Sequence, residues 1–474
     1  MASILSVGID IGTSTTQVIF SRIAMENTSG YFSVPKVSIV EKEVVYKSKV
    51  YLTPLKTPVL IDGAAVRDLV DQEYQLAGYC KKDVDTGAVI ITGESARKEN
   101  AAEVLAQLSD FSGEFVVSTA GPDLESIIAG KGSGAFQYSM DNNCTTVNLD
   151  IGGGTTNIVM FDCGETVAKG CLDIGGRLIR VKPDLEVEYV SPAAGQIAQA
   201  LGLFFRVGEP TTMQALSAVT DKMADLLAQA LGLKPQEPLL REVRTPESSS
   251  FQPVGPIRFL CFSGGVADCI GDETGGVPYG DIGVLLGRSI ARGLLVQSIP
   301  RMTGNETIRA TVVGAGTYTT SISGSTIAYA EGLLPMKNIP VLRLNEREQA
   351  ACFSGETDFL REQFGWFLEQ SSADNAALAL AGIPDPDYQD LRRLATCLAN
   401  EMDKVLPSGK AMIIILECDI AKALGLALRE ALQGRRQVIC VDGVKVEQGD
   451  YVDLGKPVLD GLVIPLVVKT LLFG

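Results

Sequence analysis

Two stretches of the chain share one pattern of apolar and polar positions. The first is Val7-Gly8-Ile9-Asp10-Ile11-Gly12-Thr13-Ser14-Thr15-Thr16-Gln17-Val18-Ile19, and the second spans residues 147–159. In each, an apolar run ends in an aspartate, a glycine-containing turn follows and a second apolar run returns, which predicts a β-hairpin. The stretches share six identities and the motif Asp-Ile-Gly-x-x-Thr-Thr, so the sequence predicts two similar half-domains.

Around these hairpins, strand and helix patterns alternate. The predicted strands are 4–11, 15–23, 37–40, 43–47, 49–52, 88–92, 115–119, 145–150, 166–171 and 257–262, and the predicted helices are 64–78, 94–108, 121–129, 193–201, 211–231 and 281–296. This alternation indicates an α/β fold in which helices cover a sheet. Residues 233–256 carry five prolines and a serine run, which predicts a surface loop or insertion.

The pattern changes near residue 299. Residues 311–326 are rich in Gly, Thr and Ser, which predicts a polar stretch dominated by turns. Later segments predict a helix at 385–405, a strand at 412–416, a helix at 420–432 and strands at 437–441 and 462–473. We therefore expect one domain over 1–298 and a separate α/β domain over 299–474. Gly314-Ala315-Gly316 could form a phosphate-binding turn, but we favour a structural role.

Length and charge narrow the classes of function. A chain of 474 residues exceeds what one hydrophobic core usually holds. Its net charge of −16 argues against binding to nucleic acid or to an anionic membrane surface. No apolar stretch approaches the ~20 residues that a transmembrane helix needs. The N-terminal apolar run is interrupted by Asp10, so we expect a strand and not a signal peptide.

The chain contains no histidine, which excludes Ser-His-Asp and Cys-His catalysis and His-ligated zinc. The ten cysteines show no Cys-x-x-Cys spacing, and most, such as Cys261, Cys418 and Cys440, lie in or beside apolar runs. We therefore expect reduced core cysteines in a cytoplasmic protein.

The paired turns suit a phosphate ligand, because consecutive backbone N–H groups and nearby hydroxyls can surround phosphate oxygens. An aspartate at the end of each inbound strand can hold a hydrated Mg²⁺ on those phosphates. The expected ligands are therefore ATP and Mg²⁺, with Asp10 and Asp150 as metal-binding and catalytic residues. The expected phosphate-binding residues are Gly12, Thr13, Ser14, Thr15, Gly152, Gly153, Gly154, Thr155 and Thr156. The alternative is that each stretch is only a hairpin whose turn requires glycine.

A third turn, Ser263-Gly264-Gly265-Val266, follows the strand 257–262. A glycine pair between a strand and a helix lets a base or ribose approach the backbone closely, so Gly264 and Gly265 are candidate adenosine-binding residues. Turns of this kind also serve as plain packing devices.

With these three motifs in this order, residues 1–298 resemble the actin/Hsp70/sugar-kinase ATPase superfamily. The resemblance implies two lobes, each with a βββαβα core, and ATP with Mg²⁺ between them, followed here by the additional C-terminal α/β domain. Asp173–Gly176 is similar to the turn after the second hairpin of Hsp70 proteins. Gly283–Ala291 is similar to the helix that crosses between the lobes.

Over its whole length, including Cys-Leu-Asp-Ile-Gly-Gly-Arg-Leu-Ile-Arg at 171–180, the chain resembles the ethanolamine ammonia-lyase reactivating factors. The resemblance implies an ATP-dependent, chaperone-like factor that helps ethanolamine ammonia-lyase exchange damaged cobalamin for adenosylcobalamin. It implies weak, partner-linked ATPase activity, and association with a bacterial microcompartment, because the family is encoded with microcompartment proteins. The C-terminal domain is then the expected contact with the lyase.

One departure from the superfamily concerns catalysis. The segment before the second hairpin supplies a catalytic glutamate in Hsp70 proteins, but residues 128–135 here contain no acid. Hydrolysis is then expected to depend on Asp10 and Asp150 alone and to be slow, with Lys131 either at a phosphate or in solvent. Two other functions remain open, a small-molecule kinase of the sugar or acetate type, which needs a carboxylate beside its acceptor, and an actin-like structural protein.

Overall fold

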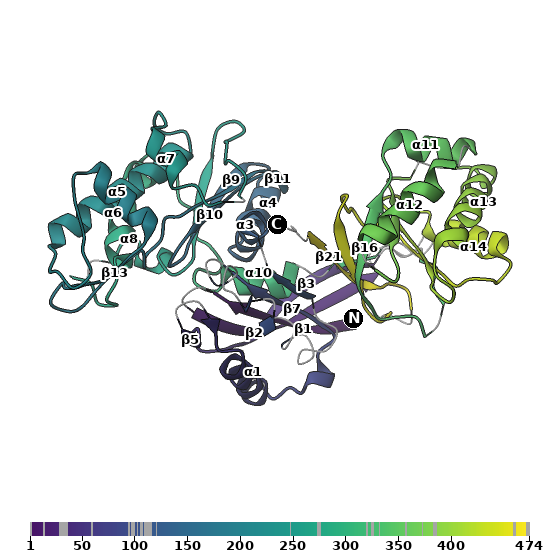
Figure 1. Ribbon diagram of the computed structural model, residues 1–474, viewed down its shortest axis with the longest axis horizontal. Coiled ribbons are helices and arrows are strands. Elements are labelled where there is room, and N and C mark those ends of the chain that lie inside the picture. The colour runs from purple at the N-terminus through teal and green to yellow at the C-terminus, as the bar shows by residue number, and fades with distance from the viewer. Residues whose placement is uncertain are drawn as a thin grey trace.

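The computed structural model describes residues 2–12, 15–27, 37–57, 60–92, 95, 100–101, 103–104, 108, 116–119, 121–246, 248–272, 276–318, 321–323, 327–330, 332–355, 358–371, 373–382, 386–457 and 461–470. These residues form three bodies (Figure 1). An N-terminal lobe lies at the bottom of the view, a second lobe at the left and a C-terminal domain at the right. The predicted helix 94–108 falls largely outside the described residues.

The N-terminal lobe is built on a sheet of order β3-β2-β1-β7-β8, with β4 paired to β2. Its first three strands are antiparallel, and β7 and β8 continue the sheet in parallel with β1. The helix α1 buries Val66, Val70 and Tyr74 in the core of this lobe. The elements are β1 (Ala2–Ile11), β2 (Thr15–Asn27), β3 (Val37–Lys47), β4 (Tyr51–Leu52), β5 (Leu55–Thr57), β6 (Leu60–Ile61), α1 (Gly63–Ala77), β7 (Thr86–Ile91) and β8 (Val116–Thr119).

The second lobe repeats this order in a sheet β11-β10-β9-β14, again with three antiparallel strands and a fourth parallel to the first. The repeated topology confirms the two similar halves and the α/β actin-like core predicted from the sequence. The elements are β9 (Thr145–Ile151), β10 (Thr156–Asp162), β11 (Glu165–Leu172), β12 (Ile179–Val181), β13 (Val187–Val190), α5 (Pro192–Ala200), α6 (Met213–Ala230), α7 (Pro238–Glu242), β14 (Phe259–Ser263), α8 (Gly283–Arg292) and α9 (Leu294–Ser298).

Two helices lie where the lobes meet, α3 (Pro122–Gly132) and α10 (Ala310–Tyr318), while α4 (Ala135–Asp141) packs on β9 and β10 of the second lobe. The helix α10 packs on α3 and across β1, β2 and β7, so it joins the lobes from within (Figure 1). The contact is very close, because a Cβ added to Gly132 would lie 1.8 Å from the carbonyl oxygen of Ala310.

This arrangement corrects two predictions and bears on a third. Residues 310–318 form a helix and not a turn-rich stretch, and residues 310–316 are buried, because tertiary packing overrides the low helix propensity of Gly, Thr and Val. Because α10 packs on α3 and on β1, β2 and β7, we propose that the two-lobed core extends through α10, past residue 298. The segment 283–291, predicted to cross between the lobes, is α8, whose Leu285, Leu286 and Ile290 are buried within the second lobe.

The segment 233–256 is also more ordered than a surface loop. It contains α7, and the side chains of Leu239, Leu240, Val243 and Phe251 are buried in the core of the second lobe. The prolines here begin the helix or shape its flanks, as Pro238 does at the first position of α7. Proline content alone therefore misclassified this segment.

The C-terminal domain has a sheet of order β15-β21-β20-β16-β17-β18-β19, in which β16 to β19 are parallel. Apolar clusters lie on both sides of the sheet, as an α/β domain requires. The elements are β15 (Ser321–Ile322), β16 (Met336–Arg343), α11 (Glu346–Ser354), α12 (Asp358–Ser371), β17 (Ala377–Leu380), α13 (Tyr388–Val405), β18 (Met412–Leu416), α14 (Ala421–Leu432), β19 (Val438–Val441), β20 (Asp450–Leu454) and β21 (Pro465–Thr470).

The part of the chain that the structure describes contains neither a membrane-spanning helix nor a disulfide bond. No helix there is both long enough and apolar enough to cross a bilayer. None of the ten cysteines, all of which lie among the described residues, forms a disulfide bond; Cys261 and Cys440 are buried and Cys418 is half-buried.

Candidate functional site

The two predicted hairpins close their turns with the same hydrogen bond. In the first, the amide of Gly12 donates to the carbonyl of Thr15 over 2.9 Å. In the second, the amide of Gly152 donates to the carbonyl of Thr155, also over 2.9 Å. The sequence repeat is therefore a repeat of backbone geometry.

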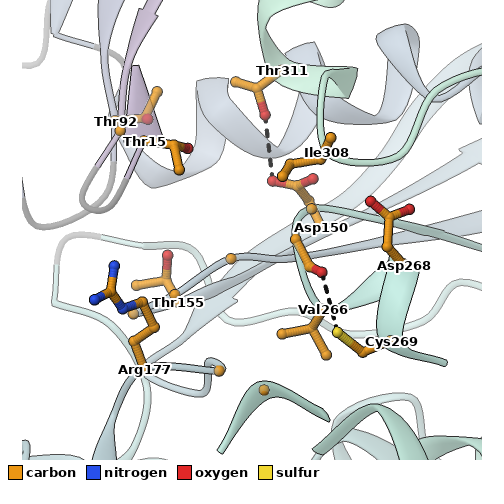
Figure 2. A pocket seen from close by; sticks show the side chains of 18 of the residues that line it. Thr15, Thr92, Asp150, Thr155, Arg177, Val266, Asp268, Cys269, Ile308 and Thr311 are labelled. Carbon is orange, nitrogen blue, oxygen red and sulfur yellow. Dashed lines mark hydrogen bonds between the residues drawn. The ribbon is translucent and has the colours of Figure 1, made fainter. Parts of the chain in front are cut away.

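Both turns border a cavity of about 620 Å³ between the lobes (Figure 2). Thr13 and Ser14 lie outside the described residues. Thr156 does not line the cavity, because its hydroxyl donates to the carbonyl of Ile174 over 2.7 Å and neighbouring strand residues face opposite sides. The other predicted residues line it together: Asp10, Gly12, Thr15, Asp150, Gly152, Gly153, Gly154, Thr155, Gly264 and Gly265.

The two aspartates are buried and held by hydroxyl groups. Asp10 is 8% exposed and accepts a hydrogen bond of 2.8 Å from Thr92. Asp150 is 6% exposed and accepts hydrogen bonds from Ser263 over 2.6 Å and from Thr311 over 3.4 Å. These donors come from β14, from α10 and from the residue after β7, so several elements fix the carboxylates.

Burial has the largest effect on the pKa values of Asp10 and Asp150. It raises the pKa of Asp10 to about 7, although the bond from Thr92 lowers it, and the charge of Asp150 adds to the rise. Burial likewise raises the pKa of Asp150 to about 6, against the lowering effect of Ser263 and Thr311. A bound cation would favour the charged form of both groups.

The third turn packs against the end of β9. Gly264 has φ +82°, and a Cβ there would lie 2.4 Å from the carbonyl oxygen of Ile151. The amide of Val266 donates to the same oxygen over 3.1 Å. Glycine is therefore required at 264 by packing as well as by conformation, while a Cβ at Gly265 would find only Ile308, at 3.9 Å.

Residues 128–135 contain no acid, but a glutamate that precedes this segment does line the cavity. Glu125 lies in the first turn of α3, is 7% exposed and borders the same cavity as Asp10 and Asp150. Glu125 lies three residues before the segment 128–135, in the acidic first turn after Gly121-Pro122, which is a helix-start signal in the sequence. Lys131 does not line the cavity, and its ammonium lies 5.2 Å from the ring centre of Phe136.

Other residues of the site gave no usable signal in the sequence. Thr92 and Thr311 reach the aspartates from segments far away in the chain. The cavity wall also includes Arg177, Asp268, Asp272 and Asp281, three of which lie between the third turn and α8. These positions become apparent only when the lobes are brought together.

The cavity wall fits a hydrated cation. Gln17, which pairs with Asp10 across the hairpin, donates to the carbonyl of Ile308 over 3.1 Å. Its Oε1 is buried without a hydrogen-bond partner among the described residues, and the side chain lines the cavity. Within the same residues, no three acidic, cysteine or histidine side chains are grouped to bind a metal directly. The amide oxygen of Gln17 and the carboxylates of Asp10 and Asp150 are oxygen ligands of the kind that suits Mg²⁺ and its waters.

Comparisons with known proteins extend over the whole chain. Residues 2–474 match the family described as "Ethanolamine utilisation protein EutA". The chain is 34% identical over 487 residues to the ethanolamine ammonia-lyase reactivase EutA of Salmonella typhimurium, covering 99% of this chain and 98% of that one. It is 35% identical over 484 residues to the protein of the same name from Escherichia coli, with the same coverage.

Similarity to solved structures is remote. A Ppx/GppA enzyme of Aquifex aeolicus has 16% identity and a TM-score of 0.36, over 57% of this chain and 70% of that one. The ethanolamine utilization protein EutJ of Carboxydothermus hydrogenoformans has 16% identity and a TM-score of 0.33, over 66% and 89%.

Burial of Asp10 predicts an unusual pH dependence of stability without nucleotide. Because its pKa is about 7 in the fold and 3.8 ordinarily, the native state keeps a proton that the unfolded chain has lost. Stability should therefore fall as the pH rises from about 4 to 7. Asp10→Asn should flatten this fall and raise the free energy of unfolding at pH 8 by ~1–4 kcal/mol.

Urea unfolding at pH 5 and pH 8 measures this effect. Asp162→Asn, at an exposed aspartate ending β10, is the control and should unfold as the wild type does. Parallel pH profiles for Asp10→Asn and the wild type would contradict the prediction.

Proposed function

This chain belongs to the EutA family of ethanolamine utilisation proteins, and we propose that it is an ATP-dependent reactivating factor for ethanolamine ammonia-lyase. The observation that carries the proposal is the match to two proteins named ethanolamine ammonia-lyase reactivase, which spans 99% of this chain and 98% of each relative. In this role it promotes the exchange of damaged cobalamin for adenosylcobalamin on the lyase.

ATP with Mg²⁺ is the proposed ligand of the cavity between the lobes. The backbone amides of the Gly12 and Gly152–Gly154 turns would face the phosphates, and the Gly264–Gly265 turn would face the adenosine. Asp10 and Asp150 would hold waters of the metal ion. When bound, ATP supplies the phosphoanhydride bond whose hydrolysis drives the cycle.

Glu125 completes the proposed catalytic set. It lines the cavity from the first turn of α3, whereas Asp10 and Asp150 line it from β1 and β9. A carboxylate in that place can orient a water molecule and accept its proton. Hydrolysis need not be as slow as the missing acid at 128–135 suggested.

The helix α10 offers a route from the nucleotide to the C-terminal domain. At its start, Thr311 donates to Asp150 of the second lobe, and the carbonyl of Ile308 accepts from Gln17 of the first. Farther along, the hydroxyl of Ser6 donates to the carbonyl of Gly316 over 2.5 Å. A change in the angle between the lobes would therefore move α10, and the chain continues from α10 into the C-terminal domain.

The cobalamin is proposed to stay on the lyase. The chain has no histidine to place under cobalt. Reactivation then requires this protein to bind the lyase state that releases damaged cofactor more tightly than the closed state. Tight binding of cobalamin by the purified full-length chain would contradict this mechanism.

Recovery of a cobalamin-inactivated lyase tests the function directly. Addition of the full-length chain, ATP, Mg²⁺ and adenosylcobalamin should restore ammonia release, and omission of ATP should prevent it. A panel of small acceptors with hydroxyl or carboxylate groups should remain unphosphorylated. Acceptor phosphorylation without any effect on the lyase would favour a small-molecule kinase, and assembly into filaments would favour an actin-like structural protein.

Glu125→Gln should slow ATP hydrolysis by about 10²–10⁴-fold while leaving Mg·ATP affinity within a few-fold of wild type, because a general base acts on the chemical step. Single-turnover hydrolysis and calorimetric binding measure the two effects. Asp123→Asn is the matched control, because Asp123 lies in the same helical turn but accepts from the backbone of Ser249 over 2.9 Å. Normal hydrolysis by Glu125→Gln would remove Glu125 from the catalytic set.

The C-terminal domain is the proposed contact with the lyase, and Trp366 is its most suitable anchor. It is the only tryptophan of the chain and is 62% exposed on α12. Trp366→Ala should weaken lyase binding by roughly 30-fold, the scale of a 2 kcal/mol interface residue, with Mg·ATP affinity unchanged. Phe204→Ala, at a 79% exposed position of the second lobe, is the comparison. Loss of lyase binding only in Phe204→Ala would place the contact on the second lobe.

A further inference from the structure

The charge of the cavity wall is poorly matched to a polyphosphate. Six carboxylates line the cavity, from Asp10, Glu125, Asp150, Asp268, Asp272 and Asp281. Among the described residues that line it, Arg177 alone carries a positive side chain. A metal ion can offset part of this excess, but a phosphate chain would still meet more negative than positive charge. The position of the one cationic side chain is therefore important.

The backbone of Arg177 is fixed to the second glycine turn. Its amide donates to the carbonyl of Gly153 over 2.7 Å, and the amide of Gly176 donates to the carbonyl of Gly152 over 2.9 Å. There is no room between these segments, because a Cβ on Gly175 would lie 2.4 Å from the carbonyl oxygen of Gly153. Arg177 therefore stays beside this turn wherever the second lobe moves.

The side chain of Arg177 is held only loosely. Its Nε lies 3.6 Å from Oδ2 of Asp281, beyond hydrogen-bond distance, and the side chain is 34% exposed. Figure 2 draws it with Thr155 among the side chains that line the cavity. Asp281 is buried but keeps a second donor, the amide of Gly283 at 2.9 Å, so another anion can replace it as the partner of Arg177.

We propose that Arg177 is a phosphate-binding residue of this site, contacting the polyphosphate chain of the bound nucleotide. The inference rests on the proposed ATP-dependent function and adds the side-chain cation that the glycine turns do not provide. Guanidinium suits this task because its planar array of N–H donors matches phosphate oxygens and it remains charged at any physiological pH. Asp281 is then its partner only while no phosphate is bound.

Binding of Mg·ATP and of adenosine to the full-length chain, both measured by calorimetry, tests the proposal. Arg177→Gln should weaken Mg·ATP binding by about 10- to 100-fold, the range for loss of a charge-assisted hydrogen bond. Adenosine binding should change less than twofold, because adenosine has no phosphate. Arg177→Lys should lose less than Arg177→Gln, since it keeps the charge without the planar donors.

Arg180→Gln is the matched control. Arg180 lies three residues farther along, does not line the cavity and stacks its guanidinium 5.4 Å from the ring centre of Tyr189. Its loss should leave Mg·ATP affinity unchanged. The proposal is overturned if Arg177→Gln binds Mg·ATP within twofold of wild type, or if it weakens adenosine binding equally. If the wild type itself fails to bind Mg·ATP, the proposed function fails first and this inference with it.

Discussion

The rest of this structure depends on two buried carboxylates that line one cavity and are costly to ionise together. Asp10 and Asp150 lie one residue before the ends of equivalent strands in the two lobes, and the charge of Asp150 raises the pKa of Asp10. Hydroxyl donors offset part of the burial penalty, but both pKa values remain raised, so the ionised pair is unfavourable without a cation. The energetic gain from a bound metal ion is therefore largest when the lobes hold the two carboxylates together, which links ligand binding to lobe position.

Because small residues pack closely around α10, a change in the position of the lobes would move this helix as a whole. At the crossing of α3 and α10, Cβ atoms on Gly132 and Gly314 would lie 1.8 and 2.0 Å from carbonyl oxygens of the opposing helix. A Cβ on Gly8 of β1 would lie 2.5 Å from the carbonyl of Val312. Backbones this close leave no space for side-chain rearrangement, so we expect α10 to shift as one body between discrete positions.

The sequence was most informative where function depends on local backbone pattern. The Asp-Ile-Gly-x-x-Thr-Thr turns need glycine and a preceding strand, and both requirements are visible in a short window. Features that depend on tertiary packing were missed. The Gly- and Thr-rich α10 has weak intrinsic helix propensity and is helical because the lobes enclose it. The hydroxyl of Thr311 acquires its role only through Asp150, which lies 161 residues away in the chain.

The lobe to which the C-terminal domain is attached determines which movement would be transmitted to a bound partner protein. Val463 packs with Ile4, Ile23 and Met25 of the N-terminal lobe, and Val467 packs in a cluster that includes Ile90. These contacts fix the C-terminal domain to the N-terminal lobe, so lobe closure would move the second lobe relative to both.

Closure of the two lobes would reach a partner bound only to the C-terminal domain through movement of α10. A partner that also contacted the exposed side chains of Phe204 and Val207 would be bound to the moving second lobe itself. Either way, the nucleotide can bias the partner only by the difference in its affinity for the two lobe positions. A typical coupling of ~1–3 kcal/mol would change partner affinity by roughly 5- to 150-fold. A coupling of that size is enough to favour one lyase state over another without any contact between nucleotide and lyase.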